Sequence, residues 1–232
     1  MGYNVILVPC AGCSIFSFME LSKKLTNDGI EVNHIKLSVD QDVDIKVDDI
    51  IQEIQEIIVK SPEKTIIFGH SMGGILILKL LECLPTNQLE KIKGLIISSS
   101  VPPCQLKKLQ SRIPNVESND FIQYLINLGN LKSDHFNDSF FRNTIFNRIK
   151  NDFLLLKEIE LEKNKNFHQD IFNKIPSIIL RGDHEQLHED YLSRWSEYPK
   201  LEIKVLKGDH FYFKQNIDSI FLEIKKRGEA FA

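Results

Sequence analysis

Short apolar runs alternate with segments of helical period along most of the chain. The runs are rich in Val, Ile and Leu, and the first of them is apolar from residue 5 to 8, which is typical of a strand buried on both sides of a sheet. They predict strands at residues 3–8, 31–37, 65–68, 94–97, 176–180 and 201–206. Between them, apolar residues recur at helical spacing and predict helices at residues 15–29, 47–58, 72–84 and 217–224. Strands joined through helices need right-handed crossovers, so the pattern predicts an α/β fold with a mostly parallel sheet and helices on both faces.

The interval from residue 101 to 175 breaks this alternation. It is rich in Asn, Lys, Phe and Leu and has helical periodicity only, with Phe121, Tyr124 and Leu128 on one predicted helix face. We interpret it as a helical lid insertion between two strands of one sheet, within a single domain spanning residues 1–232. The segment Gly228–Ala232 is expected to be loosely held.

Composition narrows the function classes. The 232 residues are 42% hydrophobic and 26% charged, which is typical of a globular domain that needs neither disulfides nor metal to fold. The net charge of −3 argues against a nucleic-acid partner held by a broad basic field. No apolar run approaches the ~20 residues that span a bilayer, so no membrane association is predicted. No basic region precedes the first apolar run, so we expect no signal peptide and a cytoplasmic location.

Four cysteines stand at positions 10, 13, 83 and 104. Cys10 and Cys13 form a CxxC pair, which raises metal binding or redox chemistry. No second CxxC and no nearby histidine pair completes a zinc site, and Ala11-Gly12 has the character of a loop rather than of a helix start. We therefore expect reduced, partly buried thiols and no metal.

The segment Gly69-His70-Ser71-Met72-Gly73 is a G-x-S-x-G motif between a buried strand and a buried helix. A serine in such a tight strand-to-helix turn has strained backbone angles, and the glycines avoid collisions with neighbouring elements. The N-terminus of the following helix provides free N–H donors for a developing oxyanion. Ser71 is therefore the predicted nucleophile.

A serine nucleophile needs a general base. In this architecture the base lies on the loop after the last strand, and His210 in Gly208-Asp209-His210-Phe211 is the histidine at that position. We expect His70 to pack beside the nucleophile, His34 to be structural, and His135 and His168 to be solvated. The chain's histidines are at positions 34, 70, 135, 168, 184, 188 and 210.

The third group must hold the imidazole in the correct tautomer and stabilise its charged form. It is expected after the strand at 176–180, where Asp183 and Glu185 follow Gly182. Sequence alone gives neither distance to His210. The carboxylate that does not contact His210 is expected to be a turn or loop-capping residue.

Several segments together resemble the type II thioesterases of nonribosomal peptide and polyketide synthesis, in the α/β-hydrolase superfamily. Pro9–Ser14 resembles the family's P-x-A-G-G-S loop, and Gly69–Gly74 resembles its G-H-S-M-G-A/G segment. Ile149–Phe153 is similar to a lid-helix run, L-R-A-D-F, and Gly208–Tyr212 is similar to G-G-H-F-F. The resemblance extends over nearly the whole chain, and the lid and histidine segments carry its narrower part.

The resemblance implies Ser71 as nucleophile and His210 as base. The family's acid is usually an aspartate three residues after the glycine, a position occupied by Glu185 here. We favour Glu185, with Asp183 as the alternative. The oxyanion would be bound by the backbone N–H groups of Met72 and Ala11. No cofactor and no metal is implied.

The implied activity is editing. An acyl or aminoacyl group would be hydrolysed from the phosphopantetheine arm of an acyl or peptidyl carrier protein through an acyl-serine intermediate. The pathway would produce an antibiotic or a siderophore. The enzyme is expected to be a monomer. Two alternatives stay open. One is a small-molecule carboxylesterase or lipase, which the shared motif around the serine allows equally. The other is a non-catalytic α/β-hydrolase that acts as a ligand receptor.

Overall fold

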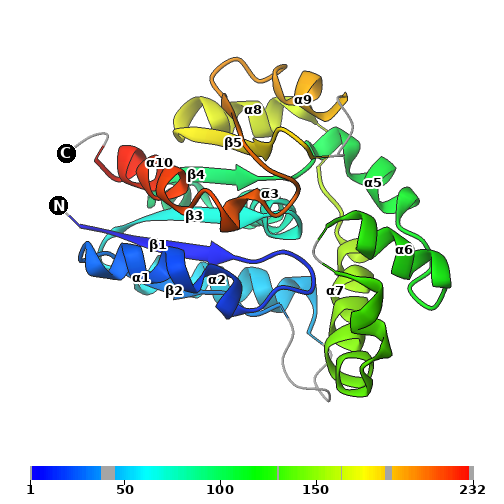
Figure 1. Ribbon diagram of the computed structural model, residues 1–232. Helices are drawn as coiled ribbons and strands as arrows, with labels where there is room; N and C mark the ends of the chain where they lie inside the picture. The colour runs from blue at the N-terminus through cyan, green and yellow to red at the C-terminus, as the bar shows by residue number, and fades with distance from the viewer. Residues whose placement is uncertain (1, 38–44, 130, 163, 186–189, 230–232) are drawn as a thin grey trace.

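A six-stranded parallel sheet forms the centre of the protein (Figure 1). The computed structural model describes residues 2–37, 45–129, 131–162, 164–185 and 190–229. The strands, in chain order, are β1 (Tyr3–Val8), β2 (Glu31–His34), β3 (Lys64–His70), β4 (Ile92–Ser98), β5 (Ser177–Gly182) and β6 (Glu202–Leu206).

The strand order is β2-β1-β3-β4-β5-β6, and every neighbouring pair is parallel. The register places Gly69 of β3 opposite Val8 of β1 and Ile97 of β4, so the carboxyl ends of the central strands share one edge. The predicted α/β fold with a mostly parallel sheet is confirmed. β2 is shorter than expected: the strand was predicted at residues 31–37, but it ends at His34.

Helices cover both faces of this sheet. Successive residues of β1 alternate between two cores: Ile6 and Val8 belong to the core with helices α2 and α3, whereas Val5 and Leu7 belong to the core with helices α1 and α10. This alternation explains why the strand is apolar at every position from Val5 to Val8. The helices of these layers are α1 (Met19–Asn27), α2 (Val47–Lys60), α3 (Met72–Cys83), the short α4 (Thr86–Leu89) and α10 (Ile217–Glu229).

The chain between β4 and β5 is helical throughout its described regular structure. In Figure 1 its helices α5, α6 and α7 stand beyond the arrowheads of β1 and β4, at the carboxyl edge of the sheet. A π-helical stretch, Phe141–Phe146, runs directly into α7. The helices of this segment are α5 (Leu106–Arg112), α6 (Asn119–Asn127), α7 (Asn147–Glu158) and α8 (Lys165–Lys174).

The end of the chain differs from expectation. We expected a loosely held tail from Gly228, but α10 continues to Glu229 and Gly228 is buried. A Cβ atom at Gly228 would lie 2.2 Å from ring atoms of Tyr3, so the helix packs closely on the first strand. Residues 230–232 lie outside the described residues. Among the helices of the described chain, none is long and apolar enough to cross a membrane.

Candidate active site

Ser71 occupies the turn between β3 and α3. It is the N-cap residue of α3, with φ 55° and ψ −114°, and its backbone N–H donates to the carbonyl of Ser98 at 2.7 Å. A positive φ is unfavourable for a residue with a side chain and persists only where the surroundings enforce it. The strained turn predicted from the motif is therefore present in the structure.

Two glycines allow this turn to form. A Cβ atom at Gly69 would lie 2.4 Å from the carbonyl oxygen of Gly73, and one at Gly73 would lie 2.2 Å from the carbonyl oxygen of Val8. These are contacts to backbone atoms, which cannot rotate away as a flexible side chain does. Any larger residue would push α3 away from β1 and β3.

His210 follows β6 and is almost fully buried. Its ring Nδ1 lies 2.5 Å from Glu185 Oε1, and this pair is shielded from water on both sides. The contact uses one ring nitrogen and leaves Nε2 for other partners. An imidazole held in this way has a fixed orientation and a carboxylate that stabilises its charged form.

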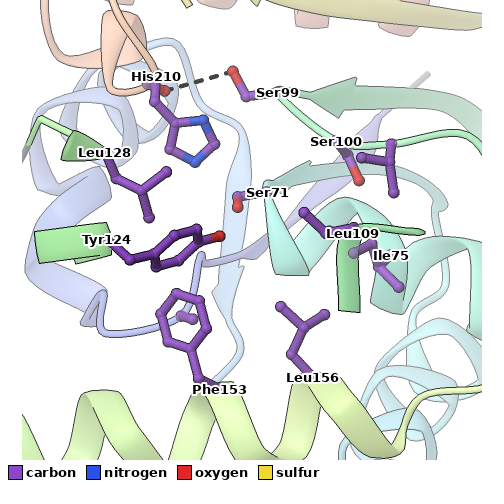
Figure 2. A pocket seen from close by; sticks show the side chains of 12 residues that line it. Ser71, Ile75, Ser99, Ser100, Leu109, Tyr124, Leu128, Phe153, Leu156 and His210 are labelled. Carbon is purple, nitrogen blue, oxygen red and sulfur yellow. Dashed lines mark hydrogen bonds between the residues drawn. The ribbon is translucent and has the colours of Figure 1, made fainter. Parts of the chain in front are cut away.

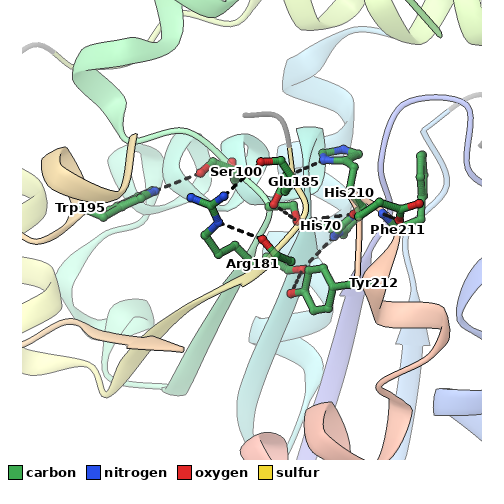
Figure 3. Close-up of polar contacts among 12 residues, drawn as sticks. His70, Ser100, Arg181, Glu185, Trp195, His210, Phe211 and Tyr212 are labelled. Carbon is green, nitrogen blue, oxygen red and sulfur yellow. Dashed lines mark hydrogen bonds and ion pairs between the residues drawn. The ribbon is translucent and has the colours of Figure 1, made fainter. Parts of the chain in front are cut away.

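Glu185 is held in turn by two hydrogen bonds, from Ser99 after β4 and from Arg181 of β5; Figure 3 shows Arg181, Glu185 and His210 together. Ser99 Oγ donates to Glu185 Oε2 at 2.9 Å, and an Arg181 guanidinium nitrogen donates to the Glu185 carbonyl at 3.1 Å. Ser99 has φ 47°, and with Ser71 it makes up the non-glycine residues of positive φ in the described chain. Ser71 directly follows β3 and Ser99 directly follows β4, so both serines lie at the carboxyl edge of the sheet.

Among the hydrogen bonds of the described residues, none joins Asp183 to the imidazole of His210. Its side chain is exposed, and Oδ1 accepts the Gly208 N–H at 2.7 Å. This backbone hydrogen bond, followed by the charge of His184, lowers the pKa of the Asp183 carboxyl. Asp183 therefore stabilises the loop that carries His210, whereas Glu185 contacts the imidazole itself.

A buried chain of polar groups lies behind His210. His70 Nδ1 lies 2.8 Å from Ser98 Oγ, which lies 2.6 Å from the Tyr212 hydroxyl. The rings of His70 and His210 are 5.1 Å apart, so His70 packs beside the site as expected. Burial, followed by the nearby charge of His210, lowers the pKa of His70 well below its usual value, and burial raises that of Tyr212.

The other described histidines lie away from Ser71. His34 is half-buried with Nε2 3.0 Å from Ser22 Oγ, and His135 and His184 are exposed. The prediction that His168 is solvated was wrong: it is fully buried, with Nε2 3.2 Å from Glu82 Oε1. The expectation rested on its place in the helical insertion, but α8 turns this face toward α3. His188 lies outside the described residues.

Ser71 and His210 line one small cavity of about 30 Å³ (Figure 2). In Figure 2 the imidazole points toward the Ser71 hydroxyl, and the Tyr124 hydroxyl lies close by. No hydrogen bond joins Ser71 to His210 among the described contacts, which is common before substrate binds. The cavity lining combines strand-end residues with side chains of α5, α6 and α7: Ala11, Ser71, Ile75, Ser99, Ser100, Val101, Leu109, Tyr124, Leu128, Phe153, Leu156 and His210.

The two residues whose backbone N–H groups are predicted to bind an oxyanion are Met72, directly after Ser71, and Ala11. Met72 is the first residue of α3, where backbone N–H groups have no partner within the helix, and Ala11 lines the cavity from the loop after β1. The expectation of reduced thiols in that loop was wrong, because Cys10 and Cys13 form a disulfide with their Cα atoms 5.2 Å apart. The bond closes the turn that contains Ala11.

Sequence reasoning missed Ser99. Its signal was the run Ser98-Ser99-Ser100 directly after a buried strand, at the edge where Ser71 was expected. The described residues contain no cluster of His, Cys, Asp and Glu side chains that could hold a metal ion. A nucleophile, an oriented imidazole and adjacent backbone donors around one cavity suit acyl transfer.

Known structures share this fold across nearly the whole chain. YbtT, a type II thioesterase from the yersiniabactin NRPS/PKS biosynthetic pathway, has a TM-score of 0.74 at 19% identity, covering 98% of this chain and 92% of its own. ClbQ, from the colibactin NRPS/PKS pathway, has a TM-score of 0.73 at 18% identity, covering 99% and 98%. A lipase-esterase related protein from Clostridium acetobutylicum ATCC 824 has a TM-score of 0.63 at 19% identity, covering 97% and 93%. These similarities establish the α/β-hydrolase fold.

No curated protein matches the sequence. The family model of the thioesterase domain, however, matches residues 4–227, from β1 into α10. The match includes every residue described above around the cavity. The chain therefore belongs to the thioesterase domain family.

Proposed function

We propose that the protein is a type II, editing thioesterase, which hydrolyses acyl or aminoacyl groups from the phosphopantetheine arm of carrier proteins in nonribosomal peptide or polyketide synthesis. The family match supports thioester hydrolysis. The similarity to YbtT and to BorB, the type II thioesterase from the borrelidin biosynthetic cluster, supports the narrower role.

The observation that carries this proposal is the contact of His210 Nδ1 with Glu185 Oε1 at 2.5 Å, on a ring that lines the same cavity as Ser71. Because Nδ1 is occupied, Nε2 is the nitrogen available to the Ser71 hydroxyl. Glu185 fixes the tautomer and stabilises the imidazolium that forms, which is the role of the acid in a catalytic triad. Asp183, the alternative acid, has its carboxylate on the Gly208 N–H instead.

In the first half-reaction Ser71 Oγ attacks the thioester carbonyl carbon while His210 Nε2 takes the hydroxyl proton. The carbonyl oxygen becomes an oxyanion, stabilised by the N–H groups of Met72 and Ala11. The carbon–sulfur bond then breaks, and the proton on His210 passes to the departing phosphopantetheine sulfur. The acyl group stays on Ser71 as an ester.

In the second half-reaction water attacks the acyl-serine. His210 removes a proton from the water, the oxyanion forms again at the same donors, and the proton returns to Ser71 Oγ as the ester bond breaks. Every step uses side chains and backbone groups of this chain, so the proposed reaction needs no metal or cofactor. Products are the free acid and the carrier thiol.

The helical segment at residues 101–175 is proposed to act as the lid of this site. Its side chains Leu109, Tyr124 and Phe153 close the cavity opposite Ser71, and the present volume of about 30 Å³ accommodates only a very small group. Short acyl groups therefore fit with little rearrangement, and a longer one requires movement of these helices. We propose that the enzyme acts in the cytoplasm as a monomer that meets its carrier partner transiently.

The test is release of acetyl and aminoacyl groups from a loaded carrier domain, followed by mass spectrometry of the carrier. The native enzyme is expected to restore the free phosphopantetheine thiol, and Ser71→Ala is expected to lose this activity by about 10⁵-fold or more. A fluorophosphonate probe should label the native enzyme and leave Ser71→Ala unlabelled. Retained release by the variant would contradict the assignment.

Free esters of the same acyl groups provide the matched comparison. Faster turnover of these esters than of the carrier thioester would favour a small-molecule esterase. If the protein binds the free ester or the carrier thioester but neither hydrolyses it nor reacts with the fluorophosphonate probe, a non-catalytic ligand receptor would be favoured.

A further inference from the structure

Helix α7 is attached to the loop after β1 by two hydrogen bonds. Asp152 Oδ2 accepts the backbone N–H of Gly12 at 2.7 Å, and a guanidinium nitrogen of Arg148 donates to the carbonyl of Cys13 at 3.1 Å. Residues four apart on a helix lie on one face, so Arg148 and Asp152 contact the loop with consecutive turns of α7. The contact joins segments far apart in the sequence.

The packing between these hydrogen bonds is equally close. Gly12 has φ +73°, and a Cβ atom there would lie 2.7 Å from Ile149 Cγ1. Ile149 is buried and belongs to the same turn of α7. At Gly12 the backbone of the loop therefore packs directly against α7, where a side chain would collide with Ile149.

Asp152 is 1% exposed, which is unusual for a carboxylate. Removing a charged group from water costs free energy, and hydrogen bonds from backbone N–H groups to a carboxylate recover much of it because they are charge-assisted. The Gly12 N–H belongs to the peptide plane that joins Ala11 to Gly12. By holding this plane, Asp152 restricts the orientation of the adjacent peptide group, which carries the N–H of Ala11, a residue that lines the cavity with Ser71.

We infer that Asp152 is a positioning residue for the oxyanion site. It does not touch the substrate; it holds the Ala11 N–H at the point where the thioester oxygen becomes negative. This inference rests on the proposed function, because it assigns the oxyanion donor of that reaction. It also means that α7, part of the segment that closes the acyl cavity, contributes to assembly of the catalytic groups.

The test compares Asp152→Ala and Asp152→Asn with the native enzyme on an acetyl thioester. Asp152→Ala is expected to lower kcat by about 10- to 100-fold with KM nearly unchanged, since loss of a whole oxyanion donor costs about 10²–10³. The amide of Asp152→Asn still accepts a hydrogen bond, but a neutral acceptor is roughly half as strong, so we expect a loss of about 3- to 5-fold.

A trifluoromethyl ketone provides a readout that a merely structural role would not move. It adds to Ser71 as a hemiketal whose oxyanion occupies the same donors, so its affinity should fall by the same factor as kcat in each variant. The control is Lys150→Ala, on the same helix, which removes the 2.6 Å contact to Glu117 without touching the loop. It should leave kcat and ketone affinity unchanged.

Unchanged kcat and ketone affinity in the folded Asp152→Ala variant would overturn the inference, and so would a rise in KM alone. If that variant does not fold, unchanged values in Asp152→Asn overturn it equally. These outcomes leave the proposed function intact, because that proposal is tested separately, by release from a loaded carrier and by the loss of turnover in Ser71→Ala.

Discussion

The strand-end loops and the helical segment above them form the two walls of one cavity, and they are built differently. The loops that carry Ser71, Ser99 and Glu185 are held by short backbone contacts. These contacts enforce unfavourable φ angles of 55° at Ser71 and 47° at Ser99. In the segment at residues 101–175, side chains make the contacts, as where the rings of Phe121 and Phe153 meet edge to face at 5.1 Å.

The difference separates two tasks. Backbone contacts leave no freedom for a reacting group, so the strand-end loops keep the nucleophile and imidazole fixed. Side-chain contacts can be changed by single substitutions. Substitutions in the segment at residues 101–175 can therefore change the shape of the acyl cavity without moving Ser71 or His210. Variants in each wall should therefore have different signatures.

The largest effect is expected at the carboxylate beside His210. Glu185→Gln should lower kcat by about 10³- to 10⁴-fold, because the amide favours the wrong imidazole tautomer and no longer stabilises its charged form. Asp183→Asn is the matched control and should change kcat by less than about 5-fold, since it acts only through the loop. Steady-state kinetics on an acetyl thioester decide between them, and the reverse ranking would assign the acid to Asp183.

The backbone character of the first wall is tested by stability. Gly73→Ala introduces a Cβ atom 2.2 Å from the Val8 carbonyl, and we expect the free energy of unfolding to fall by about 3 kcal/mol. Gly29→Ala is matched, because Gly29 has φ +78° with no atom within 4 Å, and it should cost only about 1 kcal/mol. Urea unfolding measures both. Equal losses would show that the close approach of Gly73 to the Val8 carbonyl costs no more than the unfavourable φ of Gly29.

The second wall is tested by substrate size. Phe153→Ala enlarges the cavity and should raise kcat/KM for a hexanoyl relative to an acetyl thioester by about 10-fold, because each extra methylene fits with less displacement of the helices. Phe140→Ala removes a 66% exposed ring in the same segment, away from the cavity lining. It should leave the ratio unchanged. A shift in both variants would point to general loosening of the segment.

The smallest effect concerns acid stability. Burial keeps His70 neutral in the folded protein, whereas its unfolded form takes up a proton below its usual pKa of 6.5. The free energy of unfolding should therefore fall as pH decreases from 6.5 toward the lower folded pKa of His70, by up to about 1.4 kcal/mol per pH unit, and show no contribution from His70 above 6.5. His70→Asn should flatten this slope, as measured by urea unfolding at pH 5.5 and 7.5, and an unchanged slope would contradict the prediction.

The sequence predicted best what depends on near neighbours along the chain. The alternating runs identified the parallel sheet, and Ser71 was identified because its glycines, strand and helix are all adjacent. The choice between Asp183 and Glu185 was left open, since it depends on how the loops after β5 and β6 meet. Nothing local distinguishes a carboxylate that supports a turn from one that reaches an imidazole.

Other features depend entirely on tertiary packing. His168 was expected to be solvated in the helical insertion, but α8 buries it against Glu82. The contact of Asp152 with Gly12 joins residues 140 positions apart, and no periodicity indicates it. Gly228 looked like the start of a loose tail, but the ring of Tyr3 requires a residue without a side chain there.

The close fit of α10 on β1 has a consequence for synthesis of the protein. The last helix cannot pack until it leaves the ribosome, and His210 lies just ahead of it on the loop after the edge strand β6. During synthesis, a nascent chain that already displays Ser71 therefore still lacks His210, the proposed proton acceptor. We expect the Ser71 hydroxyl to stay unreactive toward cellular thioesters until His210 has been synthesised and has packed beside it.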